Sequence, residues 1–247
     1  MGIVEAVKNI FETKENEPKH YVTAVVVAAG NATRMGHSQG KQFISLCGIP
    51  LLARTLLAFD SAQLIDEVIV VARQDDILQI SDMVNDYEIQ KVNHIVKGGE
   101  TRQQSVICGL KELNPLTDYI AIHDGARPMI LPHTIDLTIR MAMEHRAAAA
   151  GVRVKDTLKI VDEKGFIIST PLRSSLWSVQ TPQVFEMQVY KAAIEAARID
   201  HVDLTDDCQL VERLNIPVFM VEGDYSNIKI TTPEDIYIAE AILSAQY

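Results

Sequence analysis

The sequence predicts an α/β fold built on a mostly parallel central sheet. Short β-branched runs occur at 22–28, 67–72, 92–96 and 118–122, and helical patterns near 50–60, 75–87 and 102–113 separate them. A repeated strand–helix order implies parallel strands that are joined by right-handed crossovers. The first two runs are apolar nearly throughout, which is typical of strands that are covered on both faces.

A helix near 133–146 follows, and the strand–helix rhythm then breaks at about residue 150. Strand-like pieces occur at 151–154, 157–161 and 166–168, and the turn Asp162-Glu163-Lys164-Gly165 lies between the last two. This pattern indicates a β-hairpin. Because a hairpin is not stable by itself, we expect an arm over about 154–177 that projects from the body and packs against another subunit.

Helical patterns return at 186–198, 205–214 and 233–245. The last begins with Thr232 as a cap, Pro233 at the first helical position and acidic residues in the first turn. Residues 1–20 combine a short apolar-faced helix pattern with the polar stretch TKENEPKH. We therefore predict an N-terminal appendage over 1–20 and a single domain over 21–247.

The composition excludes several classes of protein. The chain has 247 residues and a net charge of −10, which disfavours bulk attraction to nucleic acid or to an anionic membrane. No apolar run approaches the ~20 residues that cross a bilayer, and the N-terminus carries no targeting pattern, so we expect a cytoplasmic protein. Three scattered cysteines fit reduced, buried thiols better than disulfides or a zinc site.

The loop after the first strand is suited to a phosphate chain. It begins with Ala28-Ala29-Gly30, and the cations Arg34 and Lys41 follow. Small residues let the backbone come close to a ligand, exposed N–H groups favour anions, and the two side chains add formal charge. The loop has neither the Gly-Lys-Ser/Thr ending of a P-loop nor a Gly-x-Gly-x-x-Gly fingerprint. It therefore predicts a nucleoside triphosphate that is held by a less common loop.

The segment His123-Asp124-Gly125-Ala126-Arg127-Pro128 follows the fourth strand. Ligands of open parallel sheets lie at the carboxyl ends of the strands, so this segment should face the phosphate loop. A single carboxylate, Asp124, suits Mg²⁺, which takes one or two carboxylates and otherwise uses water and phosphate oxygens. The alternative is a structural Asp124–Arg127 pair that closes the turn. His123 is interpreted as a packed loop residue.

Other polar positions have two interpretations each. Gly98-Gly99 precedes a helix with Ser105 one turn in, which fits either a nucleotide base or a plain strand-to-helix turn. Lys229 is interpreted as lying on a strand of buried type, where it either meets an anion or points to solvent. Thr157, Arg173 and Thr181 fit either a second phosphate group or a solvated surface.

Taken together, these motifs resemble the 2-C-methyl-D-erythritol 4-phosphate cytidylyltransferase family of the non-mevalonate isoprenoid pathway. The likeness runs from about residue 21 to 243. It is carried by AAG-x₃-RM with Lys41-Gln42-Phe43, Gly98-Gly99 with Arg102 and Ser105, HDGARP, Asp156-Thr157, Trp177 ahead of TPQVF, Thr205-Asp206-Asp207, and Asn227-Ile228-Lys229-Ile230-Thr231 with Pro233-Glu234-Asp235.

The resemblance implies a three-layer Rossmann-like nucleotidyltransferase fold and the transfer of CMP from CTP to a sugar-alcohol phosphate, with release of pyrophosphate. It implies Mg²⁺ on Asp124 and a homodimer through the β-arm, in which Thr157 and Arg173 serve the neighbour's site. The catalytic residues would be Arg34, Lys41 and Lys229; the nucleotide-binding residues Ala28, Ala29, Gly30, Gly98, Gly99, Ser105 and Asp124; and the acceptor-phosphate residues Arg127, Thr157, Arg173, Thr181 and Thr205.

Two rival functions share these residues. A ribitol 5-phosphate cytidylyltransferase would have the same phosphate loop and the same lysine segment; Trp177 with TPQ and Thr205-Asp206-Asp207 favour the isoprenoid acceptor. A non-catalytic nucleotide-binding protein would keep the fold without the chemistry; the set Arg34, Lys41, Asp124 and Lys229 argues against it.

Overall fold

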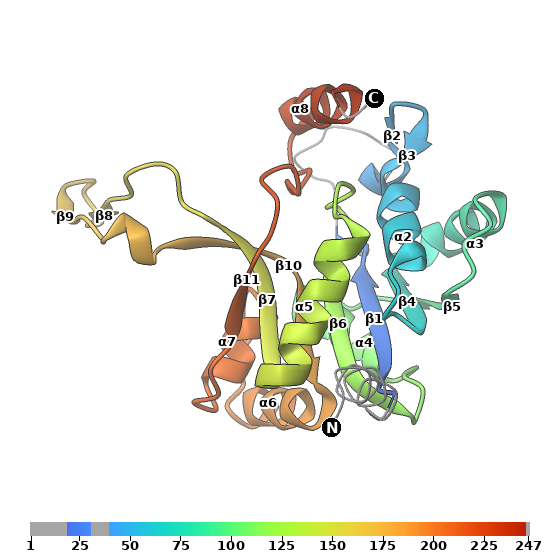
Figure 1. Cartoon of the computed structure of the whole chain (residues 1–247), viewed down its shortest axis with the longest axis horizontal. Helices are drawn as coiled ribbons and strands as arrows, with labels where there is room; N and C mark the ends of the chain where they lie inside the picture. Colours follow the sequence, from blue (N-terminus) through green and yellow to red (C-terminus); the bar gives the residue numbers. More distant parts are fainter. Residues whose placement is uncertain (1–18, 31–39, 246–247) are drawn as a thin grey trace, which may run out of the picture.

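A computed structural model describes residues 19–30 and 40–245. One seven-stranded sheet, in the order β11-β7-β10-β6-β1-β4-β5, crosses the molecule (Figure 1). Strand β10 runs antiparallel to its neighbours β6 and β7, and the other neighbouring strands are parallel. The predicted α/β class with a mostly parallel sheet is therefore confirmed. The strands are β1 Tyr21–Val27, β4 Glu67–Ala72, β5 Val92–Lys97, β6 Thr117–Asp124, β7 Ala147–Arg153, β10 Trp177–Glu186 and β11 Phe219–Glu222.

Helices cover both faces of the sheet and give three layers. Alternate residues of β1 divide between the faces: Ala24 and Val26 pack in one apolar cluster, and Val25 packs in the other. This division explains the continuous apolar runs of the sequence. On the first face lie α2 Leu51–Ser61, α3 Ile77–Asp86 and α5 Pro132–His145; on the second lie α4 Arg102–Leu110, α6 Met187–Ile199 and α7 Asp207–Glu212.

A third apolar cluster lies above the carboxyl ends of the strands. It packs the C-terminal helix α8 Pro233–Ser244 against the small hairpin of β2 Ser45–Leu46 and β3 Ile49–Pro50. The predicted start of α8 is confirmed, since the Asp235 carboxylate accepts hydrogen bonds from the backbone N of Thr231 and Thr232 at 2.7 and 2.8 Å. The helix thereby fixes the chain segment that precedes it.

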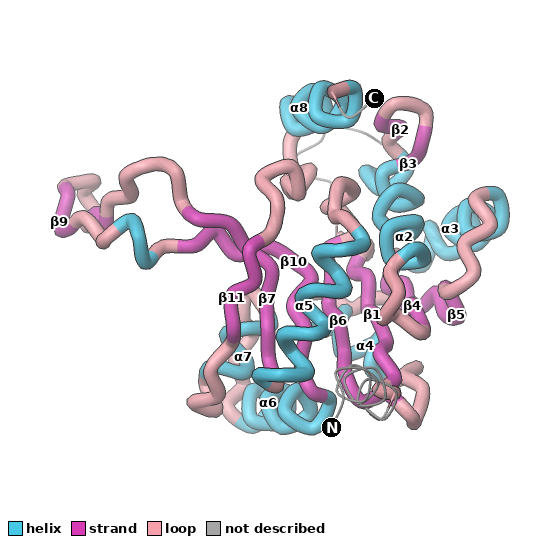
Figure 2. The backbone as a smooth tube through the Cα atoms, in the orientation of Figure 1, coloured by secondary structure: helices cyan, strands magenta, loops and turns pink. Residues whose placement is uncertain are grey.

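The projecting arm is also present. Strands β7 and β10 extend beyond the sheet and lead into the short pair β8 Ile160–Val161 and β9 Ile167–Ser169 (Figure 2). Gly165 has a φ of 86°, the turn conformation that glycine favours. Apolar arm side chains are exposed, with Phe166 at 70% and Ile168 at 65%. Such an apolar surface is typical of a protein–protein contact.

The structure corrects several boundaries that periodicity suggested. The segment Ser226–Thr231 is irregular and not a strand, so the placement of Lys229 on a strand was wrong. Ser226 N donates to the Asp224 carboxylate at 2.7 Å, and this local turn takes the place of extended pairing. Strands β10 and β11 were not expected, and the helices at 102–113 and 205–214 end earlier, at Leu110 and Glu212.

The structure tests the predictions about membrane spans and about the cysteines. Within residues 19–30 and 40–245, none of the helices has the length and apolarity that a membrane span requires. The three cysteines are free. Cys208 is buried, Cys108 is partly buried and Cys47 is exposed, so the prediction of three buried thiols holds in full for Cys208 and was wrong for Cys47. Cys47 lies in the tight β2–β3 turn with a φ of 47°. That turn projects beyond the apolar cluster and leaves the thiol in solvent.

The sheet register brings the functional loops together. Val27, the last residue of β1, pairs with Asp124, the last residue of β6. Backbone N–H groups then tie the loops to neighbouring strand ends: Gly125 N donates to Val27 O at 2.9 Å and Gly98 N to Ala72 O at 2.8 Å. The carboxyl ends of β1, β4, β5 and β6 therefore meet at one edge, as the parallel topology requires.

Candidate active site

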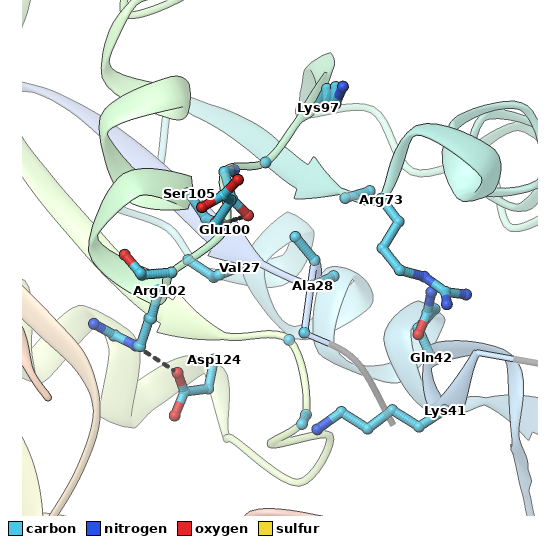
Figure 3. A pocket seen from close by; sticks show the side chains of 18 of the residues that line it. Val27, Ala28, Lys41, Gln42, Arg73, Lys97, Glu100, Arg102, Ser105 and Asp124 are labelled. Carbon is cyan, nitrogen blue, oxygen red and sulfur yellow. Dashed lines mark hydrogen bonds and ion pairs between the residues drawn. The ribbon is translucent and has the colours of Figure 1, made fainter. Parts of the chain in front are cut away.

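Two cavities adjoin at this edge of the sheet. The larger has a volume of about 400 Å³ and the smaller about 260 Å³. Three charged residues, Arg102, Asp124 and Lys229, line both cavities. Figure 3 shows Arg102 joined to Asp124 at one side of the larger cavity, with Lys41 extending toward them from the other side. Two anionic ligands that occupied the two cavities would meet at this shared wall.

The larger cavity is lined by all seven predicted nucleotide-binding residues. Gly98 sits against Ala29 and Ser105 so closely that an added Cβ would lie 2.6 Å from the Ala29 Cβ and 2.8 Å from the Ser105 Oγ. Ser105 Oγ accepts a hydrogen bond from Gly99 N at 3.2 Å, which fixes the turn before α4. The structure brings together around this cavity Ala28, Ala29, Gly30, Lys41, Gly98, Gly99, Ser105, Asp124 and Lys229.

The smaller cavity contains three of the predicted acceptor residues, Arg127, Thr181 and Thr205. Arg127 NH1 donates to the backbone O of Asn227 at 2.9 Å, so the guanidinium bridges the β6 loop and the segment that carries Lys229. Thr181 Oγ1 accepts from Asp124 N at 3.0 Å. Residues of β10 and of the loop before α7 thus complete the lining of the smaller cavity.

Asp124 is surrounded by cations. Lys229 Nζ lies 2.9 Å and Arg127 Nε 3.5 Å from Oδ2, and Arg102 Nε lies 3.2 Å from Oδ1. Burial alone would raise the pKa of the Asp124 carboxyl, but Arg102, Lys229 and Arg127 hold it well below its usual range. The carboxylate is therefore ionised at neutral pH. Arg127 thus lies beside Asp124 on the same turn, and the interpretation of Asp124 as a Mg²⁺ ligand stays a prediction.

Arg102 has a larger part in the site than the sequence suggested. The sequence motifs include Arg102 but assign it no function. In the structure its side chain bridges Asp124 and the buried Asp207, with NH1 2.6 Å from Asp207 Oδ2. The two carboxylates raise the pKa of the Arg102 guanidinium against the opposing effect of burial. The local signal was its position as the first residue of α4, directly after Gly98-Gly99-Glu100-Thr101.

Lys41 is held by a network that sequence reasoning missed. It begins a single 3₁₀ turn, Lys41–Phe43, and its Nζ donates to Ile230 O at 3.4 Å. The next residue, Gln42, is buried and donates to the Asp76 carboxylate, which Arg73 also contacts through two hydrogen bonds of 2.7 and 2.9 Å. The end of the phosphate loop is thereby anchored to the loop after β4. Gln42 and Asp76 lie in separate segments of the sequence, and no spacing rule connects them.

His123 is packed inside the protein, as predicted, but it lies on strand β6 and not in the loop. It is fully buried, its ring lies 4.9 Å from the Phe59 ring, and Nδ1 lies 3.0 Å from Thr181 Oγ1. Arg127 O lies 3.4 Å from Nε2 and can only accept, so Nε2 carries the proton of the neutral ring and Nδ1 accepts from the Thr181 hydroxyl. Burial lowers the pKa of His123 from 6.5 to about 3.

This pKa predicts acid sensitivity. Between pH 6.5 and about 3 the unfolded chain binds a proton that the folded chain does not, so stability is fully present above 6.5 and falls as the pH drops. We expect a loss of roughly 1.4 kcal/mol per pH unit at most. Urea unfolding at pH 7 and pH 5 should show this loss in the wild type and a smaller one in His123→Gln. Equal pH dependence in both would contradict the assignment.

Three predicted residues remain: Arg34, Thr157 and Arg173. Arg34 lies outside the described residues. Thr157 is exposed on the arm, and Arg173, also exposed there, donates from NH1 to Lys155 O at 3.1 Å. Neither lines a cavity of its own chain in the described ranges. The prediction that both serve a neighbouring subunit remains a prediction.

Comparisons with known proteins show which family the chain is similar to. A family model described as 2-C-methyl-D-erythritol 4-phosphate cytidylyltransferase matches residues 22–245. Relatives of that name from Caldanaerobacter subterraneus subsp. tengcongensis and Lachnoclostridium phytofermentans are 45% and 43% identical, over 90% of this chain and 98% and 96% of theirs.

Solved structures are similar over nearly the whole chain as well. The 4-diphosphocytidyl-2C-methyl-D-erythritol synthase from Anaerococcus prevotii has a TM-score of 0.83 at 35% identity and covers 92% of this chain and 97% of its own. The cytidylyltransferase from Thermus thermophilus has a TM-score of 0.72 at 28% identity, over 91% and 99%. The chain therefore belongs to the 2-C-methyl-D-erythritol 4-phosphate cytidylyltransferase (IspD) family.

Proposed function

We propose that this chain transfers CMP from CTP to 2-C-methyl-D-erythritol 4-phosphate and releases pyrophosphate, as the names of its relatives state for them. The observation that carries the proposal is the pair of adjoining cavities with Arg102, Asp124 and Lys229 in their common wall. A reaction that joins two phosphoesters needs two anion sites that meet at one point. The arrangement of these charges supplies that point.

Each cavity fits one substrate. CTP is assigned to the larger cavity, which is lined by Ala28, Ala29 and Gly30 and by the Gly98-Gly99 turn that packs against Ala29. The acceptor phosphate is assigned to the smaller cavity with Arg127, Thr181 and Thr205. A guanidinium and two hydroxyl groups are suitable partners for a phosphate monoester.

The reaction then needs positioning and charge stabilisation more than proton transfer. The acceptor phosphate has a second pKa near ~6 and is largely dianionic at pH 7, so its oxygen attacks without a general base. A bond forms between that oxygen and the α-phosphorus, and the bond to the pyrophosphate oxygen breaks. Lys229 and Arg102 offset the repulsion between the anions and stabilise charge on the α-phosphate. His123, whose pKa burial lowers, lines neither cavity and is not assigned the role of a base.

The chain provides one metal ligand at the reaction point. In the described part of the chain, no cluster of three or more His, Cys, Asp and Glu side chains could hold a metal. Among the carboxylates that the structure describes, Asp124 is the one that lines both cavities, and a single carboxylate fits Mg²⁺, which takes one or two carboxylates and completes its shell with phosphate oxygens and water. When bound, Mg²⁺ would neutralise triphosphate charge and make pyrophosphate a better leaving group. We therefore assign Asp124 to a Mg²⁺ that arrives with CTP.

A homodimer would complete the site. The arm carries Thr157 and Arg173 away from its own cavities and exposes apolar side chains. We propose that it crosses to a second copy and brings both residues to that copy's smaller cavity. Each active site would then contain residues of two chains.

Subunit mixing tests this arrangement. Arg173→Ala and Lys229→Met homodimers should each be nearly inactive at low acceptor concentration. Mixed dimers would contain one site with both lesions and one with neither, so mixing should recover activity, up to about a quarter of the wild-type value for random C₂ pairing. A mixture no more active than its components would show that Arg173 acts within its own chain.

The reaction itself is tested by pyrophosphate release. Purified chain with CTP and Mg²⁺ should release pyrophosphate with 2-C-methyl-D-erythritol 4-phosphate and far less with ribitol 5-phosphate. Preference for ribitol phosphate would reassign the acceptor. CTP binding without CMP transfer to either acceptor would support a non-catalytic nucleotide-binding protein.

A further inference from the structure

A buried pair, Tyr190 and Asp207, lies behind Arg102 and has no part in the mechanism above. Tyr190 is 0% and Asp207 1% exposed. The Tyr190 hydroxyl donates to Asp207 Oδ1 at 2.6 Å, and Arg102 NH1 donates to Asp207 Oδ2 at 2.6 Å. The two oxygens of this carboxylate are thus divided between a phenol and a guanidinium. Burial of a charged group costs stability unless its partners are fixed. We therefore ask which function the buried Asp207 carboxylate has.

The carboxylate is held in place by its surroundings. Asp207 N and Cys208 N both donate to Gln183 Oε1, at 2.9 and 3.1 Å, which ties the start of α7 to the central strand β10. The Tyr190 ring stacks on Phe185 at 5.2 Å. Burial and the neighbouring Asp207 raise the pKa of Tyr190 well above its ordinary value, so the phenol stays a donor at neutral pH. Asp207 therefore has little freedom to move.

We propose that Tyr190 and Asp207 are positioning residues for Arg102, and that they hold its guanidinium in the wall between the two cavities. The inference rests on the proposed function. With Oδ1 taken by Tyr190, Asp207 offers one oxygen to Arg102 and binds NH1, which leaves Nε directed at Asp124 Oδ1. Without the hydroxyl, both oxygens of Asp207 are open to Arg102. A bidentate pair is the stronger geometry, and it would draw the guanidinium back from Asp124.

Tyr190→Phe tests the proposal, since it removes one oxygen and keeps the ring that packs on Phe185. We expect kcat to fall roughly 10- to 100-fold, the size of effect that a small misplacement of a catalytic group has, with much less change in KM for CTP. The matched control is Tyr119→Phe, which removes the hydroxyl of another buried tyrosine. Tyr119 lies near the start of β6, at the end of the strand away from Asp124. This control should leave kcat unchanged.

A double-mutant cycle separates positioning from general stability. In an Arg102→Lys background the guanidinium group that Asp207 positions is absent, so Tyr190→Phe should have no further effect on kcat. Asp207→Asn serves as a second variant and should behave alike, with folding checked by near-UV circular dichroism. If Tyr190→Phe keeps the wild-type kcat, or lowers kcat by the same factor in both backgrounds, the inference is overturned. A wild-type chain without CMP transfer would overturn the proposed function, and the inference with it.

Discussion

Asp124→Asn is expected to lower kcat for Mg²⁺-dependent CMP transfer by ~10²–10³-fold, the cost of losing one preorganised electrostatic group. The amide keeps the shape of the side chain and leaves the bond from residue 124 N to Thr181 in place. It removes the charge that three cations share and the single carboxylate that would hold Mg²⁺. Steady-state pyrophosphate release across a Mg²⁺ titration measures the effect.

The same substitution should destabilise the fold without abolishing it. Arg102, Lys229 and Arg127 hold the pKa of Asp124 below its usual range, so the carboxylate contributes stability that is present above its unfolded pKa and is lost as the pH falls. Asp118→Asn is the matched control, because Asp118 lies on the same strand with a half-exposed side chain. Full Mg²⁺-dependent turnover in Asp124→Asn would place the metal elsewhere. An equal loss of kcat in Asp118→Asn would show that the effect comes from the stability of the strand.

Lys229→Met should be the second large effect, with kcat/KM lower by ~10²–10³-fold. The side chain keeps its length and loses the charge that lies in the wall of both cavities. Lys229 is 39% exposed at its side chain, and Arg102 and Arg127 still face the buried Asp124 without it, so the free energy of unfolding should fall less than in Asp124→Asn. The measurement is the initial rate at varied CTP and acceptor, together with urea unfolding.

Lys111→Met is the control for this variant, since Lys111 is an exposed lysine at the end of α4. It should retain wild-type kinetics. Wild-type kcat/KM in Lys229→Met would exclude Lys229 from the transition state and would move the reaction point away from the shared wall.

The sequence predicts the cavity edge well because topology carries that information. Once β1, β4, β5 and β6 are parallel neighbours, the loops that follow them must meet at one edge, and Ala28, Gly98 and Asp124 come together through register alone. The hairpin arm is equally local, since the turn at Asp162–Gly165 determines it.

The rest of the site depends on long-range contacts that leave no local pattern. Arg102 and Asp207 are 105 residues apart in the sequence, and neither periodicity nor spacing connects them. Lys229 looked like a strand residue because isoleucines flank it, but the segment is tied to the β6 loop by Ile230 N, which donates to Ala126 O at 2.8 Å. Tertiary hydrogen bonds of this kind override local propensity.

One crystal structure would test the shared wall most directly: the protein with Mg²⁺, the uncleavable α,β-methylene analogue of CTP, and 2-C-methyl-D-erythritol 4-phosphate. The α-phosphate should lie against Lys229 and Arg102, with the acceptor phosphate beside Arg127 and Thr205 and its oxygen in line with the bond to the leaving group. A triphosphate bound away from Lys229 and Asp124, or an acceptor outside the smaller cavity, would contradict the account.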